Sequence, residues 1–471
     1  MKKLPNNLSK YLIWIILSFF AFIYSFVAIV KHNHFQTGLD FGIYVQTFWS
    51  YIHLLPPHIT FYPTYGDLVF ADHFTPSLIL LAPLYSIWSD PRILLISQAV
   101  LFVLGGYPIY RFSKETLKSE FLSLSIVLSY LLFFGSQFAL TFDFHAATFS
   151  AIFLPWMFWF MFKSQWKRFI IFFLLALGAK EDTPLLLSAV SAYLIISKKN
   201  VPLGIFLSLF SFVYFLAVTK YLMPSLSYLS AKTYNTPEFP VNPFDIPLSL
   251  INSPIKIRTI LLSLLSFIFL PLLSGWFFLI TLAHFFINFI SKEFTGRWDI
   301  FLHYRVHLGS ILAFSSILGI KRILDLWMGD NNKQKLVKIF FSVSLLSIII
   351  ILDVALHLPL NTLFKPAFYR NEAWMQDNFE VIKKIPDNAY LLTQNNLAPH
   401  VANRKNIFYF PKNLSKAEYI LVDLHRNQPV INFWLSGTQE VVSKEVHEFI
   451  TDGEFIVYYQ KGQSILLKRI R

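Results

Sequence analysis

The chain has 471 residues, of which 55% are hydrophobic and only 14% are charged. This composition is typical of a membrane protein with many spans and excludes an ordinary soluble enzyme. The chain has no cysteine, which excludes disulfides, thiolate metal sites and cysteine nucleophiles. The formal net charge of +13 is explained by lysines and arginines beside the apolar segments, so we predict no nucleic-acid partner.

Apolar segments that are long enough, or nearly long enough, to cross a membrane recur from the N-terminus to about residue 357. A shorter apolar segment, 76–89, predicts a helix that lies in the membrane interface. We predict about eleven transmembrane helices, at residues 11–30, 92–110, 121–140, 147–162, 169–179, 184–197, 202–222, 259–273, 275–290, 306–324 and 339–357.

Lysines and arginines are concentrated in alternate loops of this topology. Since positively charged loops stay in the cytoplasm, the bias predicts a multi-pass protein of the cell membrane with a cytoplasmic N-terminus. Eleven spans then put the C-terminus outside. The ionisable residues considered below all fall on the outer side of this topology, so we expect the functional site to face outward.

From about residue 359 the composition becomes that of a soluble domain. Residues 389–393 and 418–424 predict two strands, and residues 455–459 and 464–468 predict a terminal hairpin. The predicted fold is therefore mainly α. It is a polytopic transmembrane helical bundle over residues 1–358, followed by a small extracytoplasmic α/β domain over residues 359–471.

A lone carboxylate, Asp40, lies between Gly38 and Gly42, ten residues after the first apolar run. Apolar neighbours such as Tyr44 and Phe48 would raise its pKa and suit it to act as a general base. Two structural alternatives are a solvated loop aspartate and the N-cap of the helix that follows.

Two acid–histidine pairs occur in later outer loops. Asp143 and His145 are two residues apart, so in an extended segment they point the same way. Ionisable groups at so tight a membrane boundary favour a function. Asp72 and His73 could bind a divalent cation or orient a substrate hydroxyl. Alternatively, Asp72 caps the helix that begins near Pro76.

Charged residues at two further positions could contact a phosphate. Lys180, Glu181 and Asp182 interrupt an apolar stretch, where the lysine could bind phosphate and a carboxylate could bind a metal. The alternative is a polar turn between two short spans. His303 and Arg305 open a later span, and the arginine is a candidate diphosphate partner. No Walker loop, dinucleotide fingerprint, HExxH or GxSxG motif occurs.

Five motifs in this order carry a resemblance that covers nearly the whole chain. They are LDFGIYVQTFW, GDLVFADHFTPSLILLAPLY, DFHAATF, AKEDTPLLL and HYR. The chain resembles a widespread, largely uncharacterised family of bacterial and archaeal predicted membrane proteins. The layout is also similar to that of the GT-C superfamily of integral-membrane glycosyltransferases.

The GT-C resemblance implies that an acid in the first outer loop, at Asp40, acts near the acceptor, and that a second acid, at Asp143, lies near a metal or the donor phosphate. It implies transfer of a sugar from a polyprenyl-phosphate donor to a glycan, lipid or protein acceptor of the cell envelope, in contact with membrane lipids. The only cofactor that the GT-C resemblance suggests is a divalent cation, Mg²⁺ or Mn²⁺. The first loop has a single carboxylate and no adjacent acidic pair, so metal dependence stays open.

Two other classes of function stay open. A transporter or flippase of a lipid-linked or polar solute would use intramembrane charges as a relay. A non-catalytic membrane scaffold would bind an envelope partner through the C-terminal domain. A shared outward cavity for Asp40, Asp143 and Lys180 would favour the enzyme. Scattered positions would favour the scaffold, and a central water-filled path would favour transport.

Overall fold

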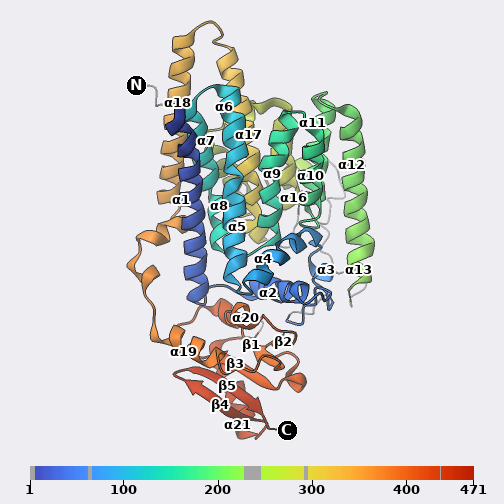
Figure 1. Ribbon diagram of the computed structural model, residues 1–471, viewed down its shortest axis with the longest axis vertical. Helices are drawn as coiled ribbons and strands as arrows, with labels where there is room; N and C mark the ends of the chain where they lie inside the picture. Colours follow the sequence, from blue (N-terminus) through green and yellow to red (C-terminus); the bar gives the residue numbers. More distant parts are fainter. Residues whose placement is uncertain (1–5, 62–65, 228–244, 291–294, 435, 471) are drawn as a thin grey trace.

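The computed structural model describes residues 6–61, 66–227, 245–290, 295–434 and 436–470. Within these residues, a bundle of helices runs along the long axis of the molecule, and a five-stranded sheet lies at one end of it (Figure 1). The first helices and the sheet come from opposite ends of the sequence, and short elements between residues 39 and 87 lie between bundle and sheet.

The bundle follows from long apolar stretches with polar residues at the helix ends. Side chains of Ser119, Asn200 and Asp330 accept backbone N–H groups in the first turns of three helices. The bundle helices are α1 (Asn6–Asn33), α5 (Arg92–Leu104), α6 (Gly106–Leu117), α7 (Glu120–Leu132), α8 (Phe134–Thr141), α9 (Ala146–Phe162), α10 (Trp166–Leu177), α11 (Thr183–Ile196), α12 (Val201–Leu216), η2 (Ala217–Leu222), α13 (Met223–Ser225), α14 (Asp245–Ser249), α15 (Pro254–Leu265), η3 (Leu270–Phe277), α16 (Phe278–Phe289), η4 (Thr295–Arg297), η5 (His303–Arg305), α17 (Val306–Asp325) and α18 (Asn331–Ala355).

Within the described ranges, six helical stretches are long and apolar enough to cross a membrane. A seventh is added if α7 and α8, which meet at an angle of 47°, count as one span. The six are Tyr11–Asn33, Arg92–Leu117, Val201–Ser225, Leu270–Phe289, His303–Asp325 and Asn331–Ala355. The chain therefore has the architecture of a multispan membrane protein.

The predicted count of about eleven spans is not confirmed. The predicted segments are helical, but several of them are too short on their own, because about 20 residues are needed to cross the apolar layer. Helices α10 and α15 have 12 residues each, and α11 has 14. The charged residues from Lys180 to Asp182 separate α10 from α11 and keep both short.

Four short elements lie across the end of the bundle that faces the sheet (Figure 1). They are α2 (Leu39–Ile52), α3 (Val69–Asp72), η1 (Pro76–Leu81) and α4 (Ala82–Ile87). Elements η1 and α4 form the short helix predicted over 76–89, whose place in the membrane interface stays a prediction. Helix α2 buries most of its length, and it carries the first candidate residue, Asp40.

The C-terminal sheet has the strand order β2-β1-β3-β5-β4. Strands β1, β2 and β3 are parallel, and β5 is antiparallel to both β3 and β4. The predicted strands and the terminal hairpin are confirmed, whereas the short β2 was not predicted. The strands are β1 (Leu391–Thr393), β2 (Ile407–Tyr409), β3 (Tyr419–Asp423), β4 (Phe455–Lys461) and β5 (Ser464–Arg469).

Alternating side chains bury both faces of this sheet. Leu392 and Ile420 pack in a small core with α21, while Leu391 and Leu421 belong to the large core that continues into the helical bundle. Helical elements of the C-terminal part are η6 (Pro359–Phe364), η7 (Pro366–Tyr369), α19 (Ala373–Ile382), α20 (Ala398–Val401), η8 (Leu414–Lys416), η9 (Val430–Phe433) and α21 (Gln439–Thr451). The division of the chain at residues 358 and 359 stays a prediction.

Gly42 lies where α2 packs against α20, so it sets how closely the C-terminal part approaches the bundle. A Cβ at this position would lie 3.2 Å from the Ala398 Cβ, which is already tight. We expect Gly42→Leu to lower the free energy of unfolding by roughly 1–3 kcal/mol through overpacking, and Gly42→Ala to cost less. Thermal unfolding of both variants in one detergent checks this. An unchanged Tm for Gly42→Leu would contradict the close α2–α20 contact.

Candidate functional site

Helix α2 holds Asp40 in its first turn. The helix begins after Gly38, whose backbone is extended (φ −128°, ψ −167°), so Asp40 is not its N-cap. The Asn395 side chain, from the C-terminal part, accepts the N–H of Leu39 at 2.6 Å. A carboxylate in a first turn is stabilised by the positive end of the helix dipole. The apolar side chains of α2 are buried, whereas the Asp40 side chain is 57% exposed.

Asp40 faces a cavity of about 690 Å³ between the bundle and the C-terminal part. On the bundle side, the cavity is lined by the segment from His34 to Asp40 and by Phe142 and Asp143. The opposite wall comes from the C-terminal part and includes Trp374 and His425. This volume suits a small-molecule or headgroup ligand, and the wall combines apolar rings with a few charged groups.

The segment from Asp143 to His145 is held beside Asp40 by two clamps. The N–H of Gly38 donates to Asp143 Oδ2 at 3.1 Å. Gln98, on α5, donates through Nε2 to the Asp143 carbonyl at 3.0 Å and accepts the His145 N–H through Oε1 at 2.9 Å. His145 Nε2 lies 3.4 Å from Asp40 Oδ2. The structure therefore brings Asp40, Asp143 and His145 together, as the sequence predicted.

The expected rise in the pKa of Asp40 is wrong. Although the side chain is partly exposed, its position inside the cavity removes water from the carboxylate and by itself raises the Asp40 pKa. The hydrogen bond and charge of His145, together with the charge of His73, outweigh burial, so the net pKa is lowered. Asp40 is therefore an ionised carboxylate at neutral pH, as a general base must be, and its lowered pKa also makes it a weaker base than a free aspartate. The sequence could not show that a histidine 105 positions later lies against it.

Asp143 behaves in the opposite way. Burial raises its pKa to about 6, although the charge of His145 and the Gly38 N–H both favour the carboxylate. Only 4% of the residue is exposed, and Oδ1 has no hydrogen-bond partner among the described residues. Two carboxyl groups on one cavity therefore differ in their readiness to ionise, a pattern that separates proton-handling roles.

We expect Asp143→Asn to stabilise the protein at pH 8 by up to about 3 kcal/mol, and by roughly half of that at pH 5. The folded pKa of about 6 lies above the unfolded value, so the folded wild type holds a proton that the unfolded chain releases. Its stability is complete below the unfolded pKa and falls as pH rises through about 6. Asparagine is uncharged and can still accept the Gly38 N–H. Thermal unfolding at both pH values measures the effect, and a gain that does not grow with pH would contradict it.

His73, Lys180, Glu181 and Asp182 form an ionic cluster next to the Asp40 site. His73 Nδ1 lies 3.2 Å from Glu181 Oε1, and Lys180 Nζ donates to Asp182 Oδ2 at 2.6 Å. Burial lowers the pKa of His73, but the charges of Asp72 and Glu181 raise it to about 9. Burial lowers the pKa of Lys180, but the charges of Asp182 and Glu181 outweigh it, so the net pKa of Lys180 is raised. Burial raises the pKa of Glu181, but the charges of His73 and Lys180 outweigh it, so the net pKa of Glu181 is lowered.

Burial raises the pKa of Asp72, and the charge of His73 offsets that only in part. Asp72 does not cap the helix after Pro76, since the N-cap of η1 is Thr75. The acid–histidine pair of the sequence therefore belongs to the ionic cluster. This cluster affects Asp40 through the positive charge of His73, which helps to lower the Asp40 pKa.

His303 joins the site by stacking on His145, with ring centroids 4.0 Å apart. Arg305 does not reach the cavity. It is fully buried, its guanidinium donates to the Arg297 carbonyl at 2.6 Å, and its Cζ lies 5.2 Å from the Phe289 ring. Neither Lys180 nor Arg305 lines the cavity. Lys180 is thus held by Asp182, whereas Arg305 keeps Nε and Nη1 without a hydrogen-bond partner among the described residues, and neither residue reaches the cavity of Asp40.

The sequence also raised metal binding by the acidic residues and their neighbouring histidines, which are Asp72, His73, Asp143, His145, Glu181 and Asp182. Across the residues that the structure describes, no three His, Asp or Glu side chains are grouped so that they could hold a metal ion. His145 Nε2 contacts Asp40 at 3.4 Å, and Asp143 accepts the Gly38 N–H rather than a bond from His145.

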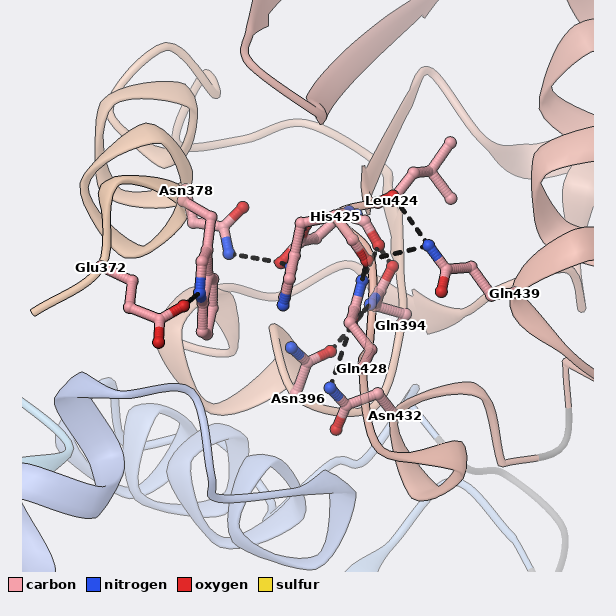
Figure 2. A network of polar contacts seen from close by, with 11 residues as sticks. Glu372, Asn378, Gln394, Asn396, Leu424, His425, Gln428, Asn432 and Gln439 are labelled. Atoms are coloured by element: carbon pink, nitrogen blue, oxygen red, sulfur yellow. Dashed lines mark hydrogen bonds and ion pairs between the residues drawn. The ribbon is translucent and has the colours of Figure 1, made fainter. Parts of the chain in front are cut away.

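The sequence reading missed the residues that form the far wall of the cavity. Asp423 is the last residue of β3, and His425 Nδ1 lies 2.8 Å from each of its carboxylate oxygens. The His425 ring stacks on Trp374, with centroids 3.9 Å apart and planes at 12°. Figure 2 shows His425 at the centre of a network of amide side chains, with its ring directed toward the helices of the bundle.

A signal for this wall was present in the sequence. Residues 418–424 were correctly predicted as a strand, and ligands bind at the carboxyl ends of parallel strands. Asp423 and His425 stand at that end, and Gln394 follows the neighbouring strand β1. The sequence could not show that His425, more than 380 positions after Asp40, lines the same cavity.

Comparison with known proteins gives one family. A family model described as "Predicted membrane protein (DUF2079)" matches residues 31–466, nearly the whole chain. No curated protein matches the chain significantly.

Proposed function

This chain belongs to the DUF2079 family of predicted membrane proteins, and we propose that it is a GT-C-like integral-membrane glycosyltransferase. It transfers a sugar from a polyprenyl-phosphate donor to a cell-envelope acceptor. The observation that carries the proposal is the ionised Asp40, paired with His145, on a cavity large enough for a sugar and its phosphate. The GT-C layout, with its first acid at the start of the first loop, supports the same assignment.

In the proposed reaction, an acceptor hydroxyl attacks the anomeric carbon of the donor sugar. The new bond joins the acceptor oxygen to that carbon, and the bond from the carbon to the phosphate oxygen breaks. Asp40 takes the hydroxyl proton, and the lipid phosphate leaves with the electron pair. A single displacement of this kind inverts the anomeric configuration. His145 holds Asp40 in place through their 3.4 Å contact, and the buried neighbour Asp143 fixes the backbone at Gly38.

In the proposed orientation, the cavity and the C-terminal part lie on the outer side of the cell membrane. This orientation is inferred from the concentration of lysines and arginines in alternate loops. The lipid chain of the donor then runs along the exposed apolar helices of the bundle. Helix α1, which leads into the cavity segment that begins at His34, offers such a surface, with Phe19 57% exposed and Phe22 66% exposed. No step of this mechanism needs a divalent cation. The Mg²⁺ or Mn²⁺ expected from the sequence stays a prediction, which transfer after EDTA treatment checks.

The test uses purified full-length protein in nanodiscs, with radiolabelled polyprenyl-phosphate sugars and a membrane extract as the source of acceptors. We expect label to move from the donor to a new product, and not to do so in empty nanodiscs. Absence of transfer with every donor, from a folded protein, would overturn the proposal. Movement of intact labelled lipid between leaflets of proteoliposomes would then favour a flippase.

A further inference from the structure

The wall that the C-terminal part contributes to the cavity is built around a histidine without a catalytic assignment. We propose that His425, Arg370 and Arg426 form the phosphate-binding side of the cavity, with a phosphate ester on a lipid as ligand. This proposal rests on the proposed function, since it places the donor phosphate opposite Asp40. All three side chains line the same cavity as Asp40 and Asp143.

His425 is held in one orientation by groups behind it. Its Nδ1 lies 2.8 Å from both Asp423 oxygens, and that carboxylate is only 1% exposed. Asn378 Nδ2 donates to Asp423 Oδ2 at 2.6 Å, which fixes the carboxylate. The carboxylate holds the Nδ1 edge of the ring, which turns the Nε2 edge away from Asp423 as the free hydrogen-bonding edge of the imidazole. Among the described residues, Nε2 has no hydrogen-bond partner, and 15% of the side chain is exposed to the cavity.

The loop that carries His425 is fixed by amide side chains, which Figure 2 shows around it. Gln428 Nε2 donates to the Asp423 carbonyl at 2.7 Å, and Gln439 Nε2 donates to the His425 carbonyl at 2.8 Å. Gln394 Oε1 accepts the Asp423 N–H at 2.9 Å. Trp374, stacked on the imidazole, is itself fixed by its donation to Glu372 at 2.7 Å. So many bonds to one short loop hold its ring in a preorganised position, as a binding residue requires.

The charges on the cavity are divided between its two walls. Asp40 and Asp143 lie on the bundle side, whereas Arg370, His425 and Arg426 lie on the C-terminal side. Both arginines are exposed, and neither has an ion pair among the described residues. Glu372 lies on the same wall and accepts the Trp374 N–H, so this wall sets two arginines against one carboxylate. An anion is therefore attracted to the C-terminal wall and repelled by Asp40, which leaves the carboxylate free for an acceptor hydroxyl.

The experiment measures binding alone, with full-length protein in nanodiscs, no acceptor and no sugar on the lipid. Polyprenyl monophosphate and inorganic phosphate are titrated separately by calorimetry, against wild type, His425→Gln, Arg426→Gln and the control His447→Gln. His447 is an exposed histidine of α21 and does not line the cavity. We expect the two cavity variants to bind polyprenyl monophosphate about 10- to 100-fold more weakly, and the control to bind like wild type.

Each outcome decides the proposal. Unchanged affinity in both cavity variants, or no binding by wild type, overturns it. Equal binding of inorganic phosphate and of the lipid keeps the anion site but overturns the lipid as its ligand. Arg426→Gln is an exposed substitution, so a folding defect in His425→Gln does not remove the test. Binding that depends on these residues, from a protein without transferase activity, would overturn the proposed function and leave the phosphate site standing.

Discussion

Replacement of Asp40 by asparagine should lower the rate of sugar transfer by about 100- to 10,000-fold, the range that a general base contributes. Asparagine has nearly the shape of aspartate, but it cannot take the proton of an acceptor hydroxyl. It also removes the negative partner of His145. Donor binding should survive, because the proposed phosphate site lies on the opposite wall. Initial rates of label transfer, at saturating donor, measure the loss.

The matched control is Asp67→Asn. Asp67 is an exposed aspartate of the segment that follows α2 and does not line the cavity. It should transfer at the wild-type rate. Full activity in Asp40→Asn would remove Asp40 as the base, and equal losses in both variants would show that the loss does not come from proton transfer.

Replacement of Gln98 by leucine should have the second-largest effect, although Gln98 touches no ligand. Its amide is the clamp on the segment from Asp143 to His145, through one bond donated and one accepted. Leucine leaves a buried carbonyl and a buried N–H unpaired, each at a cost of about 1–3 kcal/mol. Without this hydrogen bond the His145 ring is no longer held at its position beside Asp40. A shift of about 1 Å in a site can reduce the rate about 100-fold.

Two measurements separate these effects. Thermal unfolding should show a lower Tm for Gln98→Leu, and the turnover of the protein that stays folded should fall as well. Gln376→Leu, at an exposed position of α19, is the control and should change neither. Wild-type turnover in a folded Gln98→Leu protein would mean that the clamp does not position His145.

Much of the fold could be predicted because apolar runs and turns are local signals. The helices, the terminal hairpin and the strand ending at Asp423 follow from such runs. The number of spans could not be predicted, because charged interruptions such as Lys180 to Asp182 leave short helices that composition alone does not assign. Strand β2 has only three residues, too few for an alternating pattern.

The candidate site divides in the same way. Asp143 and His145 could be singled out as charges placed at a membrane boundary, where they are costly without a task, and the GT-C resemblance grouped Asp143 with Asp40. The positions of Lys180 and Arg305 could not, because the sequence does not show that Lys180 pairs with Asp182 or that the Arg305 guanidinium is buried outside the cavity. The Asp40 pKa depends on His145 and His73, whose approach is set only by the tertiary fold.

The anomeric configuration of the transferred sugar tests the central claim most directly. A polyprenyl-phosphate sugar of known configuration is incubated with wild-type protein, and the proton coupling at the anomeric carbon of the product is measured by NMR. Asp40 acting as a base in a single displacement predicts an inverted product. A product of retained configuration would require a covalent intermediate and would contradict the assignment of Asp40, and the absence of any product would contradict the transferase itself.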